Sequence, residues 1–400
     1  MTILNAKRVL LGVSGSIACY KAADLASKLT QLGAAVDVVL TSAALNFVSP
    51  LTFQSVTGRR AYADADLWGP EGHVLHVSLG RQAELLVIAP ATANTLAKLA
   101  TGQADNLLTL TALASTGPLL LAPAMDGGMY QHVATQANLK TLKERGAVIV
   151  GPQRGHLASG LSGVGRMVEP GELLGHIRLL LGRSGLLAGR KVLVTAGGTQ
   201  EALDPVRALT NRSSGKQGYA LAQAALDQGA EVTLISAPTA LTPPIGCKLV
   251  SVTSAQEMLA AVLAAAKGCD ILFMAAAVAD FRPSKEARQK IKRVAGVPKL
   301  TLLANPDILL ELRKAKGKKP KVIVGFAAES KDLAASAKQK LKAKHLDLIV
   351  ANDITAQDAG FEVDTNRVIL LDRSGHRQDL PLMSKAEVAR VIVERAAALL

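Results

Sequence analysis

The stretch QLGAAVDVV at residues 31–39 decides the fold, because the similar stretch DQGAEVTLI recurs at residues 227–235. In each copy we expect a helix to end at a glycine and a strand rich in β-branched residues to follow at once. Working outward, a strand and a glycine turn precede each helix, at residues 7–13 and 191–196. The chain therefore contains two Rossmann-like strand–helix–strand units. Their predicted helices span residues 17–31 and 215–228.

Short apolar runs bounded by glycine or proline continue both patterns and are typical of buried parallel strands. They lie at residues 36–40, 85–89, 118–122, 147–150, 232–236, 271–276, 322–326, 346–351 and 368–371. Because strand–helix–strand crossovers are right-handed, we predict parallel sheets covered by helices. The predicted fold class is α/β, with two consecutive doubly wound parallel-sheet domains at residues 1–183 and 188–400. Such folds bind ligands beyond the carboxyl ends of their strands.

The composition is that of a folded protein, since 49% of the 400 residues are hydrophobic and 20% are charged. The apolar runs fall short of the roughly 18–20 residues of a membrane span, and the N-terminus has no signal-peptide pattern. We therefore expect a cytoplasmic location and no membrane partner. The three cysteines form no C-x-x-C pair, and the seven histidines lack metal-ligand spacing. A disulfide framework and a structural zinc site are not expected.

The net charge of +14 points to an anionic partner. Residues 184–400 carry 31 Lys and Arg against 21 Asp and Glu, so most of the excess lies in the second half. Aromatic residues make up only 3% and do not alternate with basic ones, which disfavours nucleic-acid binding by base stacking. The basic runs Lys314–Lys321 and Lys338–Lys344 are interpreted as solvated faces.

The loop Gly12–Ile17, GVSGSI, ends the first strand and opens a helix, where backbone amides and hydroxyls can receive a phosphate. Its spacing is not G-x-G-x-x-G, and Thr41 and Ser42 stand where a dinucleotide site would have an acidic residue. The loop favours a flavin mononucleotide over a dinucleotide. On its own it fits a simple tight turn equally well.

Further segments make the pattern specific. The first half carries Gly-Ser-Ile-Ala at 15–18, His-Val-Ser-Leu at 76–79, Pro-Ala-Thr-Ala-Asn-Thr at 90–95 and Pro-Ala-Met-Asp-Gly-Gly-Met at 123–129. This combination resembles the flavin-dependent cysteine decarboxylases. The segments of the second half resemble phosphopantothenate–cysteine ligase; they are residues 195–201, 204–207, 210–218, 275–281, 290–293, 305–308, 325–329 and 351–353.

Together the two halves resemble the bifunctional phosphopantothenoylcysteine decarboxylase/phosphopantothenate–cysteine ligase family of coenzyme A synthesis, over nearly the whole chain. The resemblance implies a CTP-dependent condensation of 4′-phosphopantothenate with cysteine through an acyl-cytidylate. An FMN-dependent oxidative decarboxylation of 4′-phosphopantothenoylcysteine then gives 4′-phosphopantetheine. FMN would be the cofactor, Mg²⁺ would assist the nucleotide, and CTP would be a substrate.

In the first half, the resemblance implies a catalytic role for His76, a residue type that exchanges protons near neutral pH. His73 is a nearby alternative. A lone histidine at a strand end would otherwise simply bond a backbone carbonyl. The FMN-binding residues implied by the resemblance are Gly15, Ser16, Ile17, Thr41, Ser42, Ala91, Asn94 and Met125.

Two candidate catalytic residues depart from the family pattern. Asp126 stands where the family often has an asparagine that holds the substrate carboxylate, so it must be protonated, paired with a cation or turned away. Ser159 stands near a cysteine that many relatives carry in a flap over the substrate, and a hydroxyl is a far weaker acid than a thiol. These departures leave open a flavin domain that binds FMN without decarboxylation.

In the second half, the resemblance implies that Lys290 meets the triphosphate, with Lys292 and Arg293 as neighbours that could substitute. Asp280 would bind the ribose or the metal region of the nucleotide, and Asn211 the acyl carbonyl of the intermediate. The nucleotide pocket would be lined by Asn305, Pro306, Asp307, Ile308 and Phe326. From the residues alone, Ser213–Lys216 is no P-loop, because Gln217 follows the lysine, and it fits a helix N-cap equally well.

Two alternatives belong to other classes. One is a two-domain NAD(P)-dependent oxidoreductase, and the other is a regulatory scaffold with an active or inactive ligase half. Nucleic-acid binding is not expected. By analogy with the family we expect a homo-oligomer, with trimeric decarboxylase contacts, dimeric ligase contacts and a dodecamer as their combination.

Overall fold

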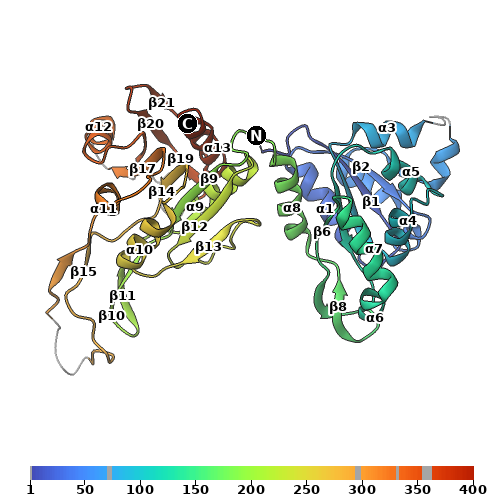
Figure 1. Ribbon diagram of the computed structural model, residues 1–400, viewed down its shortest axis with the longest axis horizontal. Coiled ribbons are helices and arrows are strands. Elements are labelled where there is room, and N and C mark those ends of the chain that lie inside the picture. The colour runs from blue at the N-terminus through green and yellow to red at the C-terminus, as the bar shows by residue number, and fades with distance from the viewer. Residues whose placement is uncertain (1, 70–73, 293–298, 330–332, 354–362) are drawn as a thin grey trace. The chain divides into compact units, whose positions relative to one another are not determined.

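The computed structural model describes residues 2–69, 74–292, 299–329, 333–353 and 363–400. The chain divides into two compact units, Met1–Leu181 and Gly182–Leu400, and each is described by itself below (Figure 1). The predicted domain limits, 1–183 and 188–400, stay predictions. Within the described residues, no helix combines the length and the hydropathy that a membrane crossing requires.

The first unit contains a six-stranded parallel sheet in the order β3-β2-β1-β4-β5-β6. Its strands are β1 (Arg8–Val13), β2 (Ala35–Leu40), β3 (Ala61–Ala63), β4 (Leu85–Ala91), β5 (Leu119–Pro123) and β6 (Val148–Ile149). All seven residues of the central strand β4 are buried, as expected for a strand with a helical layer on both faces. The chain order doubles back between β1 and β4, which is the point where such sheets bind ligands.

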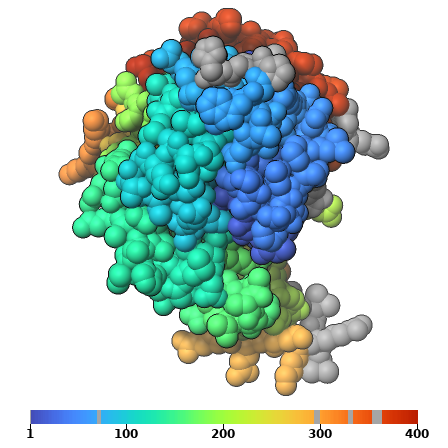
Figure 2. All heavy atoms as spheres, turned by 90° about the vertical axis from the view of Figure 1, so that its right-hand side faces the viewer, coloured from blue at the N-terminus to red at the C-terminus, as the bar shows by residue number. Residues whose placement is uncertain are grey.

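Helices cover both faces of this sheet. Helices α1, α2 and α8 pack on one face around Leu25 and Phe53, and α3, α4, α5 and α7 pack on the other around Leu79 and Leu96. The helices are α1 (Cys19–Gln31), α2 (Pro50–Thr57), α3 (Leu75–Gln82), α4 (Ala93–Thr101), α5 (Leu107–Ala114), α6 (Gly127–Gln131), α7 (Val133–Glu144) and α8 (Pro170–Gly182). The short 3-10 helices are η1 (Ala44–Asn46) and η2 (Asp64–Trp68). In the space-filling view, light blue and teal residues form much of the surface of this unit (Figure 2).

An antiparallel hairpin of β7 (Gln153–His156) and β8 (Ser162–Arg166) leaves the first unit's sheet. It docks on the segment after β5, where Met125 N donates to Gly165 O at 3.0 Å. A side chain at position 165 would not fit, because its Cβ would lie 2.1 Å from Met125 O. The hairpin therefore lies beside the carboxyl end of β5.

The second unit contains an eight-stranded sheet in the order β13-β12-β9-β14-β17-β18-β20-β21. The first six strands are parallel, which confirms the predicted doubly wound α/β fold for both units. The strands are β9 (Lys191–Ala196), β12 (Glu231–Ser236), β13 (Lys248–Ser251), β14 (Ile271–Met274), β17 (Val322–Glu329), β18 (Leu348–Asp353), β20 (Val368–Asp372) and β21 (Arg377–Asp379).

One strand departs from the prediction. The run 368–371 was expected to be parallel, but β20 is antiparallel to β18 and turns back into β21. The Asp372 carboxylate shapes that turn by accepting the amides of Ser374 and His376, both at 3.0 Å. A short apolar run does not reveal its direction, and antiparallel strands at one side of an otherwise parallel sheet, here β20 and β21, are common in such folds.

The second unit's helices are α9 (Lys216–Asp227), α10 (Ala255–Ala265), α11 (Ile308–Lys314), α12 (Leu333–Ala343) and α13 (Lys385–Ala397). Small antiparallel pairs join β10 (Gln200–Asp204) to β11 (Arg207–Thr210), β15 (Phe281–Pro283) to β16 (Leu302–Ala304), and β19 (Thr365–Asn366) to β22 (Met383–Ser384). Strand β10 packs against β15, and both lie away from the main sheet (Figure 1). We call these two hairpins and residues 284–292 the arm.

The segment Gly182–Leu187 lies against the C-terminal end of α9 within the second unit. Leu187 N donates to Gln228 O at 2.8 Å, and the Leu187 side chain is fully buried. A Cβ on Gly182 would lie 2.5 Å from Asp227 O, and a Cβ on Gly185 would lie 2.8 Å from Gln228 O. Glycine at these two positions lets the two backbones pack in contact.

Candidate functional site

The loops after the carboxyl ends of β1, β2, β4 and β5 surround a cavity of about 410 Å³ in the first unit. This volume suits a cofactor or a small ligand. Small and hydroxyl-bearing side chains dominate its walls. The lining residues are Gly15, Ser16, Thr41, Ser42, Ala43, Thr92, Ala93, Asn94, Thr95, Lys98, Asn106, Ala124, Met125 and Met129.

The loop after β1 packs so closely on its neighbour that position 15 has no room for a side chain. A Cβ on Gly15 would lie 2.5 Å from the Cβ of Ala43. The buried Ser14 ties this loop to the one after β4, since its Oγ donates to Pro90 O at 2.7 Å and accepts from Thr92 N at 3.0 Å. Ser14 therefore fixes the distance between two walls of the cavity.

The predicted cofactor-binding residues of this half fall into two groups. Six of them line the cavity, namely Gly15, Ser16, Thr41, Ser42, Asn94 and Met125. Ile17 and Ala91 are not among the lining residues. Ile17 is 61% exposed in the turn before α1, while Ala91 ends β4 with its side chain fully buried. Strand and turn geometry thus direct these two side chains elsewhere.

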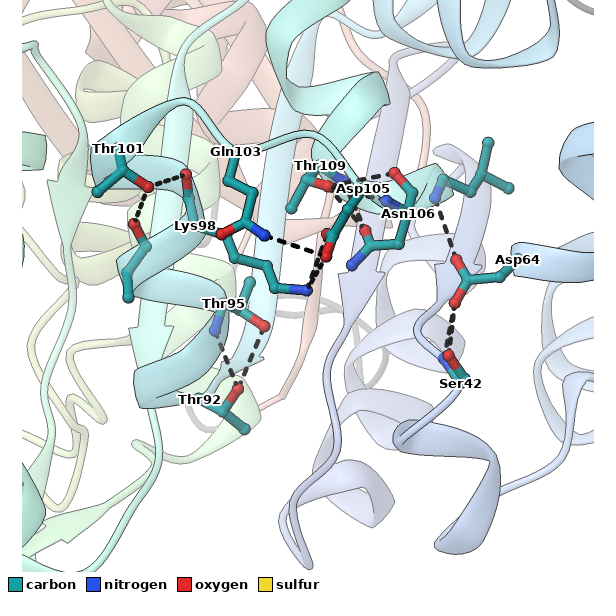
Figure 3. Close-up of polar contacts among 12 residues, drawn as sticks. Ser42, Asp64, Thr92, Thr95, Lys98, Thr101, Gln103, Asp105, Asn106 and Thr109 are labelled. Atoms are coloured by element: carbon teal, nitrogen blue, oxygen red, sulfur yellow. Dashed lines mark hydrogen bonds and ion pairs between the residues drawn. The ribbon is translucent and has the colours of Figure 1, made fainter.

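Polar contacts at the edge of the cavity involve residues that the sequence prediction missed (Figure 3). Lys98 lines the cavity, and its Nζ donates to both oxygens of Asp105, at 2.8 and 2.7 Å. Asp64 accepts from the amide and the hydroxyl of Ser42, at 3.1 and 2.7 Å. Thr95 and Lys98 are three residues apart and so share one face of α4, a spacing that could have revealed Lys98. Asp64 is the first residue of η2, directly after β3, and no sequence motif around it indicates a binding site.

His76 lies in the first turn of α3, not at a strand end as predicted. Leu75 and Leu79 are both buried, with the spacing of a helix, and Gly80 packs on the backbone of α5. Among the described residues, the buried Nδ1 atom of His76 has no hydrogen-bond partner, and His76 is not one of those that line the cavity. His73 lies outside the described residues. Within the described residues, His76 Nδ1 is therefore available for a further hydrogen bond, and the ring does not line the cavity of its own chain.

Asp126 and Ser159 contact each other directly. Ser159 Oγ donates to Asp126 Oδ2 at 2.7 Å, and Gly128 N donates to Asp126 Oδ1 at 2.9 Å, which caps α6. The Ser159 hydrogen bond, and then the Gly128 amide, lower the pKa of the Asp126 carboxyl. Asp126 is therefore ionised near neutral pH, and of the three expected arrangements protonation is the one that this geometry disfavours.

The second unit holds a larger cavity, of about 550 Å³, beside the carboxyl end of β14 and the middle of β17. The seven predicted residues Asn211, Asp280, Asn305, Pro306, Asp307, Ile308 and Phe326 all line it. The loop Ser213–Gly218 at the N-terminus of α9 lines it as well. Gly215 adopts φ 77°, and a Cβ there would lie 2.7 Å from Thr239 Cγ2, so this turn requires glycine. The helix N-terminus gives the cavity a positive potential.

Amide side chains organise the wall of this cavity. Asn211 Nδ2 donates to the carbonyls of Ala277 and Val278, at 3.2 and 3.3 Å. Asn305 Nδ2 donates to Ala279 O at 2.9 Å, and its backbone amide donates to Asp280 O at 2.8 Å. Both asparagines therefore brace the segment after β14. The side-chain oxygen of Asn305, Oδ1, also accepts a hydrogen bond from Arg282 of the arm.

Asp307 has structural partners. Its Oδ1 caps α11 by accepting from Leu309 N at 3.0 Å and from Leu310 N at 3.2 Å. Its Oδ2 lies 3.0 Å from Lys344 Nζ. The residue predicted to line a nucleotide pocket thus also holds a lysine at its edge.

Among the described residues four lysines line this cavity, and the sequence prediction had missed all of them as ligand-binding residues. They are Lys216, Lys340, Lys344 and Lys385. The interpretation of the run 338–344 as a solvated face was wrong for Lys340 and Lys344, which are four residues apart on one face of α12. Lys385 is only 7% exposed, and burial, followed by the charge of Lys216, lowers its pKa. These cations suit a polyanionic ligand.

Lys290 and Lys292 are not brought to the cavity lining. Both are exposed on the arm, and Arg293 lies outside the described residues. The prediction placed them after a flexible polar stretch, and in the structure that stretch runs along β10. Within the described ranges no group of three or more His, Cys, Asp or Glu side chains could hold a metal ion.

Comparison with known proteins places both units. A family model described as Flavoprotein matches residues 2–182, and one described as DNA/pantothenate metabolism flavoprotein C-terminal domain matches residues 187–400. The coenzyme A biosynthesis bifunctional protein CoaBC of Bacillus subtilis (strain 168) is 46% identical over 400 residues, covering 99% of this chain and 98% of the relative. The chain belongs to the CoaBC family.

A CoaBC protein of Mycobacterium tuberculosis (strain ATCC 25618 / H37Rv) is also 46% identical, over 402 residues, covering 97% of this chain and 96% of the relative. Among solved structures, the C-terminal domain of a CoaBC protein is 40% identical and covers 54% of this chain and 98% of that chain, with a TM-score of 0.46. Family membership confirms the predicted resemblance, and with it a bifunctional enzyme of coenzyme A biosynthesis.

The first cavity fits the flavin that a CoaBC flavoprotein domain implies. Gly15 leaves space at the backbone that any side chain would fill. The hydroxyl-bearing residues Ser16, Thr41 and Thr92 line the same cavity. Of the two described carboxylates that line the second cavity, Asp280 is exposed and Asp307 is already paired to Lys344. Mg²⁺ usually takes one or two carboxylates together with substrate phosphates, so Asp280 suits a metal that arrives with a nucleotide.

Proposed function

We propose that this CoaBC protein condenses 4′-phosphopantothenate with cysteine at the expense of CTP, and then decarboxylates the product to 4′-phosphopantetheine with FMN. The carrying observation is that each unit has its own cavity beside the carboxyl ends of its own sheet, one rich in hydroxyls and one rich in lysines. Two anionic ligands of different size suit these two cavities.

For the ligase half, we assign charge stabilisation to the lysines around the second cavity. In the first step, the 4′-phosphopantothenate carboxylate attacks the α-phosphorus of CTP and expels pyrophosphate. The cysteine amine then attacks the acyl carbonyl and releases CMP. Negative charge grows on the phosphoryl oxygens, which Lys216, Lys340 and Lys385 can neutralise from the cavity wall. Asn211 is assigned to the acyl carbonyl, which its Nδ2 would contact in place of one of the carbonyls of Ala277 and Val278. Asp280 is the carboxylate assigned to Mg²⁺.

Lys290 is assigned to the triphosphate as well, although it is not part of the described cavity lining. Replacing Lys290 by Gln should reduce ligation to a residual rate and leave flavin absorbance unchanged. Ligation at the wild-type rate would reject this role.

For the decarboxylase half, bound FMN would supply the oxidation of the substrate thiol and the return of the electrons after carbon dioxide has left. This chain's loops after β1 and β4 would hold its phosphate and orient it. His76 would carry a proton, through a ring whose Nδ1 has no partner within the described residues.

A homo-oligomer would reconcile the position of His76 with this role. Since His76 is not in the lining of its own chain's cavity, we propose that it serves the cavity of a neighbouring copy. Trimeric contacts through the decarboxylase half and dimeric contacts through the ligase half would combine into a dodecamer. A cytoplasmic location also stays a prediction.

The deciding experiment combines an absorption spectrum of the purified protein with a mass-resolved assay of 4′-phosphopantothenate, cysteine and CTP. We expect flavin absorbance, CMP, pyrophosphate, carbon dioxide and 4′-phosphopantetheine. A colourless protein that consumes no CTP would reject the proposal.

A second candidate function rests on the Asp126–Ser159 contact. An ionised Asp126 would repel the substrate carboxylate, and Ser159 lacks a thiol, so the first unit could bind flavin without decarboxylating. Accumulation of 4′-phosphopantothenoylcysteine in the same assay, with flavin retained and not bleached, would favour this alternative.

A further inference from the structure

Asp204 is a buried carboxylate at the end of β10 that the ligase mechanism above does not use. It is 2% exposed and is not among the lining residues of the cavity. Its Oδ1 accepts from Val206 N and Arg207 N, both at 3.0 Å, which closes the turn between β10 and β11. Its Oδ2 accepts from Arg207 Nε at 2.9 Å, from Arg207 Nη2 and from Ile291 N at 3.1 Å.

The two oxygens therefore serve different purposes. Oδ1 makes a local turn of a kind that aspartate commonly forms. Oδ2 reaches a residue 87 positions further along the chain. Arg207 Nη2 also donates to Ile291 O at 2.9 Å, so the carboxylate and the guanidinium together satisfy both backbone polar groups of Ile291.

These contacts fix the part of the arm that carries Lys290 and Lys292. The β15–β16 pairing ends at Pro283, and the backbone beyond it has few sheet bonds. Ala287 N donates to Leu203 O at 3.0 Å, and the Asp204 and Arg207 contacts at Ile291 follow. Residues 287–291 thus lie along β10, next to β11, in the arm visible in Figure 1.

Charge strengthens the arrangement. The Arg207 side chain holds the pKa of the Asp204 carboxyl well below its usual range, and the amides of Val206 and Ile291 act in the same direction. Asp204 therefore stays ionised wherever the enzyme is assayed. A buried, ionised acceptor with five donors is a rigid anchor for a neighbouring backbone.

We propose that Asp204, with Arg207, is a positioning residue for Lys290 in the ligase reaction. The inference rests on the proposed function, because it requires Lys290 to meet the triphosphate. Asp204 touches no substrate. It fixes the backbone next to Lys290, so that the ammonium group does not have to be ordered anew in each turnover.

The test uses the full-length enzyme and the variant Asp204→Asn. An asparagine can keep the Oδ1 contacts of the turn, but its amide nitrogen would face three N–H donors in place of Oδ2. We expect the ligation kcat to fall about 10- to 100-fold. Hydrogen exchange should rise at the backbone amides of residues 287–292, with flavin absorbance unchanged.

Asp372→Asn is the matched control. Asp372 is 3% exposed, caps its own turn through Ser374 and His376, and pairs with Arg395; within the described residues it makes no hydrogen bond or ion pair with the arm. We expect this variant to lose stability and to keep the ligation kcat of its folded fraction. Equal kcat losses in both variants would overturn the proposal, because general destabilisation would then explain them.

A double-mutant cycle separates positioning from an independent effect. In the Lys290→Gln background, with enzyme in excess to measure the residual rate, Asp204→Asn should cost little more. If Asp204→Asn lowers both backgrounds by the same factor, or leaves the wild-type rate unchanged, the proposal is wrong. If the single variant Lys290→Gln ligates at the wild-type rate, the assigned role of Lys290 is rejected, and with it the part of the proposed function on which this inference rests.

If Asp204→Asn does not fold, Arg207→Lys replaces it in the same cycle. A lysine keeps the positive charge beside Asp204 but cannot donate to Asp204 through two nitrogens and to Ile291 O at once. We expect a smaller loss of kcat in the same direction, and again none in the Lys290→Gln background. A loss of equal size in both backgrounds would reject positioning here too.

Discussion

Replacing Ser14 by alanine should lower the stability of the two loops that line the flavin cavity, although Ser14 is not itself one of the lining residues. Ser14 is 1% exposed, and its Oγ joins the loop after β1 to the loop after β4. Alanine has the right size for the site but can neither donate to Pro90 O nor accept from Thr92 N. Because both loops line the cavity, the loss should be felt in stability and in flavin affinity together.

The magnitude follows from the partners that remain. Pro90 O keeps a second donor, Ser14 N at 3.3 Å, so its loss is one ordinary hydrogen bond of about 1 kcal/mol. Thr92 N is left without that acceptor, and an unsatisfied buried amide costs about 1–3 kcal/mol. Because Thr92 is only half-buried, we take the lower part of that range, about 1–2 kcal/mol. We therefore expect the first unit to lose about 2–3 kcal/mol, which lowers the transition temperature of a unit this size by roughly 4–12 °C.

The assay is thermal release of flavin, followed by its fluorescence, alongside a flavin titration of the apo-protein. Ser55→Ala is the control, because Ser55 is exposed and its hydroxyl donates to Leu51 O of its own helix α2. We expect that control to stay within about 0.5 kcal/mol of the wild type. If Ser14→Ala releases flavin at the same temperature as the control, with unchanged affinity, Ser14 does not hold the two loops together.

Three further predictions concern the two cavities. Gly15→Val should abolish flavin binding and leave ligation intact, because its Cβ would lie 2.5 Å from Ala43 Cβ; flavin absorbance and CMP release measure the two effects. The Asp126–Ser159 contact should be complete above the ordinary Asp pKa of about 3.9 and weaken as pH falls toward the lowered pKa of Asp126, since protonation removes the negative charge that strengthens the hydrogen bond. Hydrogen exchange in residues 157–161 should rise over that acidic range in the wild type, and a Ser159→Ala variant that shows the same pH profile would contradict this. Lys385→Gln should raise the Kd for CTP about tenfold without destabilising the apo-enzyme, because it removes a desolvated charge beside Lys216. The exposed Lys338→Gln should change neither; calorimetric titration with CTP measures the Kd, and thermal unfolding of the apo-enzyme measures the stability.

The loops at strand ends were predictable because their signals are local. Gly15 follows an apolar strand run and Gly215 precedes a helical pattern, and Ser16 and Ser214, which neighbour them in sequence, line the same cavities. The predicted residues from Asn305 to Ile308 reach the second cavity for the same reason, since one short loop follows one strand.

Residues that reach the cavities from helices escaped prediction for a physical reason. Lys98, Lys344 and Lys385 project from helices, where a basic residue resembles any solvated one in sequence. Only the packing of the helix decides which face meets the cavity. Contacts between distant segments escaped as well, such as Ser159 with Asp126, and the direction of β20 could not be read from its apolar pattern.

The contact between Gly182–Leu187 and the end of α9 has a practical consequence for dividing the enzyme. A separately produced ligase half that starts at residue 182 would keep the Leu187 amide bonded to Gln228 O and the Leu187 side chain in the core. One that starts at residue 188 would uncover the end of α9 and open a hydrophobic hole beneath it. Bulky substitutions at Gly182 or Gly185 should expose the same spot to proteases in the intact chain, because they would separate the segment Gly182–Leu187 from α9.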